Sequence, residues 1–241
     1  MLNKLPNHVA LVSMQDTPEQ NRLQYASDET RAVGEICESL HLQCIQPEEP
    51  CNAAVLEALE ACSIIHFAGH GVTNREDPLR SLLLLKDWKE DPLTIGSILD
   101  MDLKHNLPFL AYLSACGTGR ILDEKSIDES IHIISAFQLI GFRHVVGTLW
   151  EVNDELCAYM ARLIYEFLLA SGVGDNAVSG GLHHASRSLR DEWVREECHA
   201  RNQESGPQEP ARDIISGRDV VLCEVLEPKR PLWAPYVHFG A

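Results

Sequence analysis

One apolar run near the middle of the chain stops abruptly at a cysteine: Phe109-Leu110-Ala111-Tyr112-Leu113-Ser114-Ala115-Cys116-Gly117-Thr118-Gly119. A short apolar run with a glycine-rich end is typical of a buried strand. A second run, Ser63-Ile64-Ile65-His66-Phe67-Ala68, ends in the same way at Gly69-His70-Gly71. In open α/β sheets, ligands bind at the carboxyl ends of parallel strands. A histidine and a cysteine at two such ends form a candidate pair of base and nucleophile.

Strand-like and helix-like segments alternate on the amino-terminal side of this run. The order strand, helix, strand, helix, strand predicts a parallel sheet with covering helices. The strands are expected at residues 8–14, 42–45 and 62–68, and the helices at 27–40 and 52–61.

On the carboxyl-terminal side the same alternation continues, and it is then interrupted. Residues 191–230 are charged and contain proline and glycine, so we expect an irregular excursion there with a strand at 220–225. The apolar end, residues 232–240, is expected to dock on the sheet. The other expected elements are a hairpin arm at 81–85, helices at 94–99, 126–140, 153–171 and from 175, and a strand at 143–150.

The composition is that of an ordinary globular protein with an acidic balance. The 241 residues are 45% hydrophobic and 23% charged, with a formal net charge of -16. This charge argues against nucleic acid and anionic membranes as partners, because both would repel the chain. Basic proteins or peptides are compatible with it, and a merely solvated acidic surface explains it as well.

The eight cysteines are scattered and form no CxxC pair. Such usage in a chain of this length, without a signal peptide or an apolar run of spanning length, favours a reducing, cytoplasmic location. Cys62 and Cys157 stand in apolar periodic segments, so most of the cysteines are expected to be buried small hydrophobes. The full set is Cys37, Cys44, Cys51, Cys62, Cys116, Cys157, Cys198 and Cys223.

Four blocks of sequence together resemble the CHAT family, whose members are caspase-like cysteine peptidase domains often fused to tetratricopeptide repeats and distantly related to separases and caspases. The resemblance runs from about His8 to the C-terminus, apart from the excursion, which is longer than the family's usual connection. The blocks are His66-Phe67-Ala68-Gly69-His70-Gly71, Leu113-Ser114-Ala115-Cys116, Gly141-Phe142-Arg143-His144-Val145-Val146-Gly147-Thr148-Leu149-Trp150, and Trp233 to Gly240.

The resemblance implies a fold and an architecture. The fold is an α/β, caspase-like three-layer sandwich with a mostly parallel central sheet and helices on both faces. Residues 1–241 would form one such domain, carrying the excursion at 191–230, and the domain would be cut from a longer multidomain protein with tetratricopeptide-type or other regulatory domains.

The resemblance also implies peptide-bond hydrolysis in a protein or peptide substrate by a Cys–His dyad, without a cofactor. Cys116 would be the nucleophile, and His70 would act as base and then as acid toward the leaving amine. The backbone N–H groups of Gly71 and Cys116 would bind the oxyanion, where one well-aimed donor contributes about 2.7–4 kcal/mol. A free thiol has a pKa near 8.5, so a cationic imidazole must favour the thiolate if it is to react at neutral pH.

His66 and His70 imitate the spacing of a helical metal pair. On a strand, however, two side chains four residues apart lie on one face about 13 Å from each other. We therefore interpret His66 as a core or supporting histidine. His132 and the pair His183-His184 stand on expected helices without cysteine or carboxylate partners at ligand spacing, so no metal site is expected.

Residues that would choose the substrate follow the strand at 143–150. Trp150-Glu151-Val152-Asn153-Asp154 resembles the separase-like segment that shapes the S1 pocket, in which an acidic residue receives an arginine. Asp154 is the first candidate for that role and Glu151 the second. Asp154 equally suits a first helical turn, where its charge is favourable. The acidic loop residues Asp123, Glu124, Asp128 and Glu129 would reinforce a basic preference or be solvated, whereas Arg120 would oppose it.

The leading hypothesis is therefore a regulated cysteine endopeptidase. A caspase-like binding or regulatory module without turnover is the alternative, which the presence of both His70 and Cys116 disfavours. A redox-sensing thiol ranks last, because the sequence shows no obvious resolving cysteine.

Overall fold

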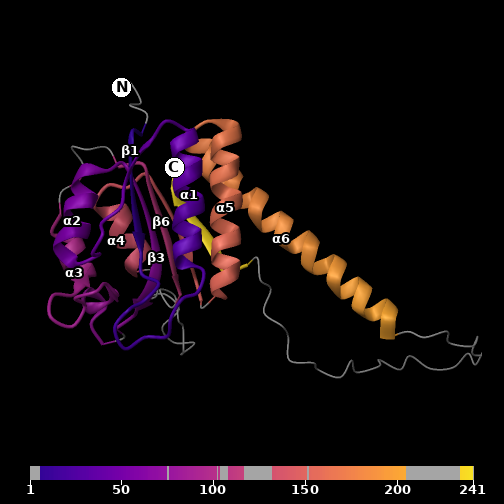
Figure 1. Cartoon of the computed structure of the whole chain (residues 1–241), viewed down its shortest axis with the longest axis horizontal. Coiled ribbons are helices and arrows are strands. Elements are labelled where there is room, and N and C mark those ends of the chain that lie inside the picture. The colour runs from indigo at the N-terminus through magenta and orange to yellow at the C-terminus, as the bar shows by residue number, and fades with distance from the viewer. Residues whose placement is uncertain are drawn as a thin grey trace, which may run out of the picture.

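The computed structural model describes residues 6–74, 76–101, 103, 108–116, 132–150, 152–204 and 234–240, with the side chains of 116, 132 and 196–204 excepted. Strands and helices alternate through most of the described chain (Figure 1). The elements are β1 (His8–Ser13), α1 (Ala26–Ser39), β2 (Gln43–Ile45), α2 (Asn52–Ala61), β3 (Ile64–Val72), a 3₁₀ turn (Pro78–Arg80), β4 (Leu82–Leu83), β5 (Leu93–Thr94), α3 (Ile95–Leu99), β6 (Leu110–Cys116), α4 (His132–Leu139), β7 (His144–Thr148), α5 (Asp154–Ser171), α6 (Asp175–Glu204) and β8 (Tyr236–Gly240).

The main sheet has the strand order β2-β1-β3-β6-β7-β8. Its first five strands are parallel, and β8 closes the edge in antiparallel pairing with β7. The apolar C-terminal segment therefore docks on the sheet as predicted. The short strands β4 and β5 form an antiparallel hairpin that pairs with the end of β3.

Helices cover both faces of this sheet, which makes three layers. In Figure 1, α1, α5 and α6 stand on one side of the strands, and α2, α3 and α4 on the other. Alternate residues of β1 enter the two cores: Val9 and Leu11 pack on the side of α1 and α5, whereas Ala10 and Val12 pack on the side of α2 and α4. Strands buried on both faces need apolar residues at nearly every position, which explains their continuous hydrophobic runs.

Local sequence signals place the helix ends. The Asn153 side chain accepts hydrogen bonds from the N–H groups of Glu155 and Leu156, so it caps the N-terminus of α5 as expected. Gly172 has a φ of 78° where α5 ends, and Gly141 has a φ of 118° shortly after α4. Glycine adopts such left-handed conformations without steric cost.

The prediction for residues 191–204 was wrong. This charged stretch is helical, because α6 continues as far as Glu204. Its second half stands away from the sandwich (Figure 1). A helix that presents no apolar face to a core is easily mistaken for irregular structure, because hydrophobic periodicity is the main sequence signal for a helix. The expected strand at 220–225 lies outside the described residues, as does the first turn of the helix expected at 126–140.

Among the described residues, no helix combines the length and the apolar character needed to cross a membrane.

Candidate active site

The backbones of His70 and Cys116 lie side by side at the carboxyl edge of the sheet. β3 and β6 are parallel neighbours, and their register makes His70 the Cα partner of Cys116. Adjacent strands are about 4.8 Å apart, and register partners occupy the same face of a sheet. The thiol itself lies outside the described side chains, as does the Gly117–Gly119 turn that follows it. The two strand ends that carry the candidate pair are therefore neighbours.

The imidazole of His70 is half-buried and has a defined partner. Its Nε2 lies 2.8 Å from the backbone carbonyl oxygen of Asn21, in the loop between β1 and α1. A carbonyl only accepts hydrogen bonds, so this contact assigns the proton to Nε2. In the neutral ring, the lone pair is then on Nδ1. The loop is itself held in place, because the Trp88 indole N–H donates to the Pro18 carbonyl oxygen at 3.1 Å.

The N–H group of Gly71 points toward the side of β3 on which β6 lies. The Ser63 carbonyl accepts from the N–H of Phe109 at 2.6 Å, so the peptide groups of the odd-numbered residues of β3 face β6. On the other side, the His70 carbonyl accepts from the N–H of Leu84 at 2.9 Å. Backbone groups of successive strand residues point to opposite sides. Gly71 therefore presents its donor toward the strand that ends in Cys116.

His66 occupies the same face of β3 four residues, or two pleat repeats, deeper. Its Nε2 lies 3.0 Å from Oε1 of Glu29 on α1, and both side chains are essentially inaccessible to solvent. The ring stacks on Tyr112, with centroids 4.8 Å apart, and meets Tyr165 of α5 edge-on at 5.5 Å. The interpretation of His66 as a core histidine is confirmed. Burial of this kind requires a polar partner, which Glu29 provides.

The sequence model of the CHAT domain family matches residues 3–241. The chain belongs to the CHAT family. Among solved structures, the domain resembles an Arg-specific cysteine proteinase, gingipain R (RgpB), with a TM-score of 0.51 and 10% identity over 76% of this chain. It also resembles a complex of the pro- and mature domains of RgpB from Porphyromonas gingivalis, with a TM-score of 0.50 and 11% identity over 75% of this chain.

These likenesses confirm the predicted fold of the CHAT domain, a caspase-like α/β sandwich. The matched regions cover 42% and 43% of the two gingipain chains, so the domain corresponds to less than half of each. No curated protein matches the sequence.

In this CHAT domain, only one of the two S1 candidates lies among the described residues. Glu151 lies outside the described residues. Asp154 is the first residue of α5, and its Oδ2 accepts a hydrogen bond of 2.7 Å from the backbone N–H of Tyr25, the residue that caps α1. Asp154 therefore ties the starts of α1 and α5 together, a contact that the sequence analysis did not consider. The loop residues Arg120, Asp123, Glu124, Asp128 and Glu129 also lie outside the described residues.

Burial makes several of the other cysteines of the domain poor nucleophiles. Burial raises the pKa of the Cys37 thiol to about 12 and that of the Cys62 thiol to about 11, with nearby Cys44 adding to both shifts. Cys157 is also buried. A thiol held in its neutral form does not attack a carbonyl, since the thiolate is the reactive species. The prediction that most cysteines are small core residues is confirmed for these three.

Sequence reasoning missed two groups near the site, Glu29 and the Asn21 carbonyl. Glu29 had a signal: it precedes the buried residues Val33 and Cys37 at intervals of four, so it stands on the inward face of α1. A charged residue at such a position indicates a buried partner. The Asn21 carbonyl had no sequence signal, because every residue carries a backbone carbonyl. Only the path of the loop brings this one to His70.

Proposed function

We propose that this CHAT domain is a cysteine endopeptidase in which Cys116 is the nucleophile and His70 the general base. The observation that carries the proposal is the register of β3 and β6, which makes these two residues direct neighbours at the carboxyl edge of the sheet. Membership of the CHAT family and the gingipain-like fold support the same reaction class.

In the proposed reaction, Nδ1 of His70 takes the proton of the Cys116 thiol, because Nε2 is engaged by the Asn21 carbonyl. The thiolate attacks the carbonyl carbon of the scissile peptide bond, and the C=O electron pair moves onto oxygen. The N–H groups of Gly71 and Cys116 donate to this oxyanion. The C–N bond then breaks as the imidazolium returns its proton to the leaving amine. A water molecule deprotonated by His70 hydrolyses the resulting thioester.

The Asn21 carbonyl supports this cycle by orienting the ring. It accepts the Nε2 proton both in the neutral ring that carries its proton there and in the imidazolium, so it fixes the ring plane throughout the proton transfer. The same role is played by a carboxylate in Ser-His-Asp triads. Here a backbone group performs it, so no side-chain substitution at position 21 removes the acceptor.

A peptide probe with an electrophilic acyloxymethyl ketone tests the assignment of the nucleophile. We expect covalent labelling of the wild-type chain at Cys116, located by peptide mass spectrometry, and no labelling of Cys116→Ala. Cys51→Ala is the matched control, because Cys51 is partly accessible, forms no disulfide and lies on the amino-terminal side of α2. Labelling that survives Cys116→Ala sinks the proposal, and a folded wild type that is neither labelled nor cleaves any peptide favours a binding module without turnover.

We further propose that the substrate carries a basic residue at P1, received by Asp154 or Glu151. Asp154 stands at the start of α5, directly after the strand next to β6. Gingipain R, an Arg-specific cysteine proteinase, gives a precedent for such a preference on this fold.

Asp154→Asn separates recognition of P1 from the contact with Tyr25. The amide oxygen of asparagine still accepts from the Tyr25 N–H, whereas the charge is lost. We expect kcat/KM to fall about ten-fold for a peptide with P1 arginine, the size of one lost charge-assisted hydrogen bond. For the same peptide with P1 citrulline, we expect little change. Equal losses for both peptides contradict a role for Asp154 in S1 and leave Glu151→Gln as the next variant.

We also propose that the domain acts in a reducing, cytoplasmic compartment under the control of flanking domains. All five cysteines with described side chains are free, which supports a reducing environment. Comparing the labelling rate of residues 1–241 with that of the full-length protein tests the regulation. Equal rates under all conditions argue against it.

A further inference from the structure

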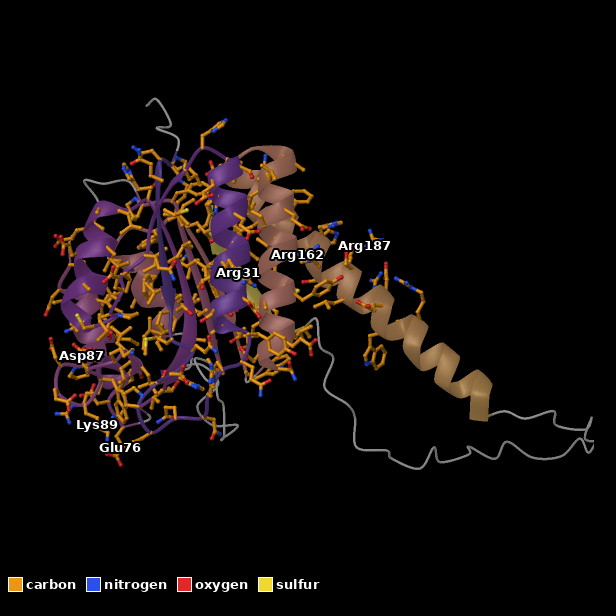
Figure 2. The ribbon with its side chains drawn as sticks, in the orientation of Figure 1. Arg31, Glu76, Asp87, Lys89, Arg162 and Arg187 are labelled. Atoms are coloured by element: carbon orange, nitrogen blue, oxygen red, sulfur yellow. The ribbon has the colours of Figure 1, made fainter. Side chains whose placement is uncertain are left out.

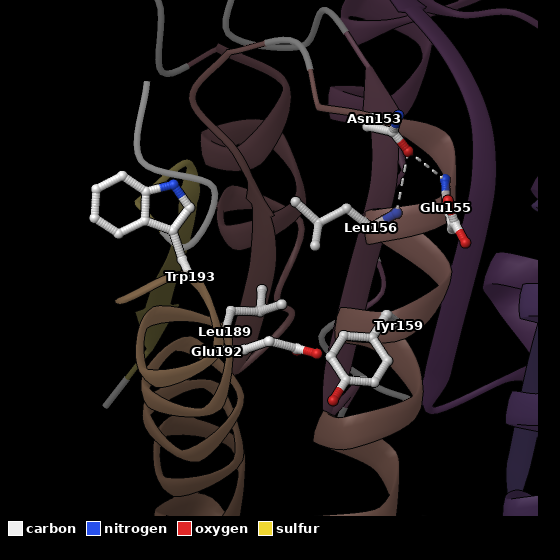
Figure 3. Close-up of a pocket in the computed structure, with 7 residues that line it drawn as sticks. All are labelled: Asn153, Glu155, Leu156, Tyr159, Leu189, Glu192 and Trp193. Carbon is white, nitrogen blue, oxygen red and sulfur yellow. Dashed lines mark hydrogen bonds between the residues drawn. The ribbon is translucent and has the colours of Figure 1, made fainter. Parts of the chain in front are cut away.

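A groove of about 450 Å³ lies between α5 and α6, on a part of the molecule that the proposed reaction does not use. Its volume falls in the range of about 300–1,000 Å³ that is usual for ligand sites. Figure 3 shows Leu189 and Glu192 reaching from α6 toward Tyr159 on α5, with Leu156 pointing into the space between the helices. Trp193 lines the α6 side.

Helix geometry explains why these residues share the groove. On α6, the spacings of three and four between Leu189, Glu192 and Trp193 put all three on one face. On α5, Leu156 and Tyr159 are likewise three residues apart. Leu189 is 6% exposed and forms the floor, whereas Tyr159 is 38% exposed and keeps aromatic surface accessible. The groove is therefore apolar at its base and aromatic at its sides.

The charges around the groove are acidic. Glu155 and Glu192 line it, and in the described part of the chain neither has an ion pair. Several neighbouring cations have partners within their own helices: Arg162 of α5, labelled in Figure 2, pairs with Glu166 at 2.8 Å, Arg190 pairs with Asp191 at 2.8 Å, and Nε of Arg195 donates to the Asp191 carbonyl oxygen at 3.2 Å. The groove therefore offers negative charge beside aromatic rings.

This combination suits one side chain above others. A guanidinium stacks on aromatic faces and forms charge-assisted hydrogen bonds to carboxylates, while its three methylenes cover apolar surface. An aspartate or glutamate would be repelled, and a purely apolar side chain would leave the carboxylates unpaired.

The groove is also close to the candidate active site in sequence, since Asn153–Leu156 follow soon after β7 at the carboxyl edge of the sheet.

We infer that the α5–α6 groove binds an arginine-bearing segment of another protein. The segment occupies the groove with its guanidinium between the Glu192 carboxylate and the ring of Tyr159 or Trp193. The inference does not depend on Cys116 as a nucleophile, because binding at this groove requires no bond to be broken.

Binding of a fluorescent decapeptide with one central arginine tests this in the full chain carrying Cys116→Ala, which removes any turnover. Fluorescence anisotropy gives the Kd, with the same peptide containing citrulline as the neutral isostere. We expect the arginine peptide to bind about ten-fold more tightly, and Glu192→Gln to weaken it by about the same factor. Trp193→Ala is expected to weaken the binding of both peptides.

Glu35→Gln is the matched control for charge. Glu35 is an exposed residue of α1 that does not line the groove, and its loss changes the net charge by the same amount. We expect the affinity for the arginine peptide to remain unchanged. An equal loss in Glu35→Gln, or equal affinity for the citrulline peptide, overturns the inference.

Two other occupants are distinguished by the same assay. If the peptide binds only after Lys229→Gln and Arg230→Gln are introduced, the chain's own basic segment fills the groove. If the wild type self-associates in sedimentation and Glu192→Gln abolishes this, the occupant is a second copy. Either result overturns the assignment to another protein.

Discussion

His66 and His70 stand on the same strand and on the same face of the sheet, yet their surroundings are opposite. His66 is inaccessible to water, paired with the Glu29 carboxylate, stacked on Tyr112 and edge-on to Tyr165. His70 is half-buried, has a backbone carbonyl as its hydrogen-bond partner among the described residues, and lies next to Cys116 in register. The partners of His66 come from α1 and α5, whereas the partner of His70 comes from the loop before α1. The same residue type therefore serves the core at one position and is available for chemistry at the other.

The largest expected effect separates the two histidines by activity. His70→Ala is expected to slow labelling of Cys116 by an electrophilic peptide about 10²–10⁴-fold, because the general base is lost. The free energy of unfolding should change little, since the ring is only half-buried. Rates of labelling followed by intact-protein mass spectrometry measure the first quantity and urea unfolding the second. A rate equal to that of the wild type would remove His70 from the proposed mechanism.

The converse substitution tests the buried partner. His66→Ala is expected to lower the free energy of unfolding by about 3–5 kcal/mol, because it opens a cavity beside Tyr112 and Tyr165 and leaves the Glu29 carboxylate buried without a partner. Chemical denaturation followed by circular dichroism measures the loss. A double variant with Glu29→Leu serves as the control, since removing the stranded carboxylate should recover part of the stability. A variant as stable as the wild type contradicts the core role.

A glycine between the two histidines gives a smaller effect. Gly69 faces the opposite side of β3, where an added Cβ would lie 2.7 Å from the Phe67 ring and 2.9 Å from the Met14 Cβ. Gly69→Ala is therefore expected to cost about 1–3 kcal/mol through overpacking. Gly174→Ala is the control, because no atom lies within 4 Å of its added Cβ. Equal melting temperatures for the two variants would show that the strand shifts without strain.

The smallest expected effect is on the pH dependence of stability. It concerns His238 of β8, at the far edge of the sheet. Nε2 of His238 lies 2.9 Å from Nδ1 of the buried His144, whose Nε2 bonds Asp175. Burial, and secondarily the neighbouring His144, lower the pKa of His238 below its usual 6.5. Below pH 6.5 the unfolded chain therefore binds more protons than the folded one, so stability falls as the pH falls from 6.5 toward the folded pKa.

His238→Gln isolates that contribution. Urea midpoints at pH 7.5 and pH 5.5 should differ less in this variant than in the wild type, because the glutamine does not titrate. The sign is opposite to that of a histidine stabilised by a carboxylate. An identical difference in both proteins would show that other groups carry the pH dependence.

Much of the fold followed from patterns that are local in the chain. The apolar runs ending at Ala68 and Cys116 indicated buried parallel strands, and the alternation of strands and helices indicated the layered sheet. The cap at Asn153 and the docking of the C-terminal strand were also predicted. The helix from Asp191 to Glu204 was not, because no apolar face marks it.

For the candidate site as well, some features followed from the local sequence and others only from the tertiary structure. The sequence alone determined that a histidine and a cysteine stand at the ends of two strands, because strand ends are marked by local turn residues. Only the tertiary structure decided that these strands are neighbours in register, that the Asn21 carbonyl holds His70, that Asp154 is tied to Tyr25 and that Glu29 pairs with His66. Each of these is a contact between residues far apart in the chain. Such contacts depend on how layers pack and loops close, and no local pattern of residue types encodes them.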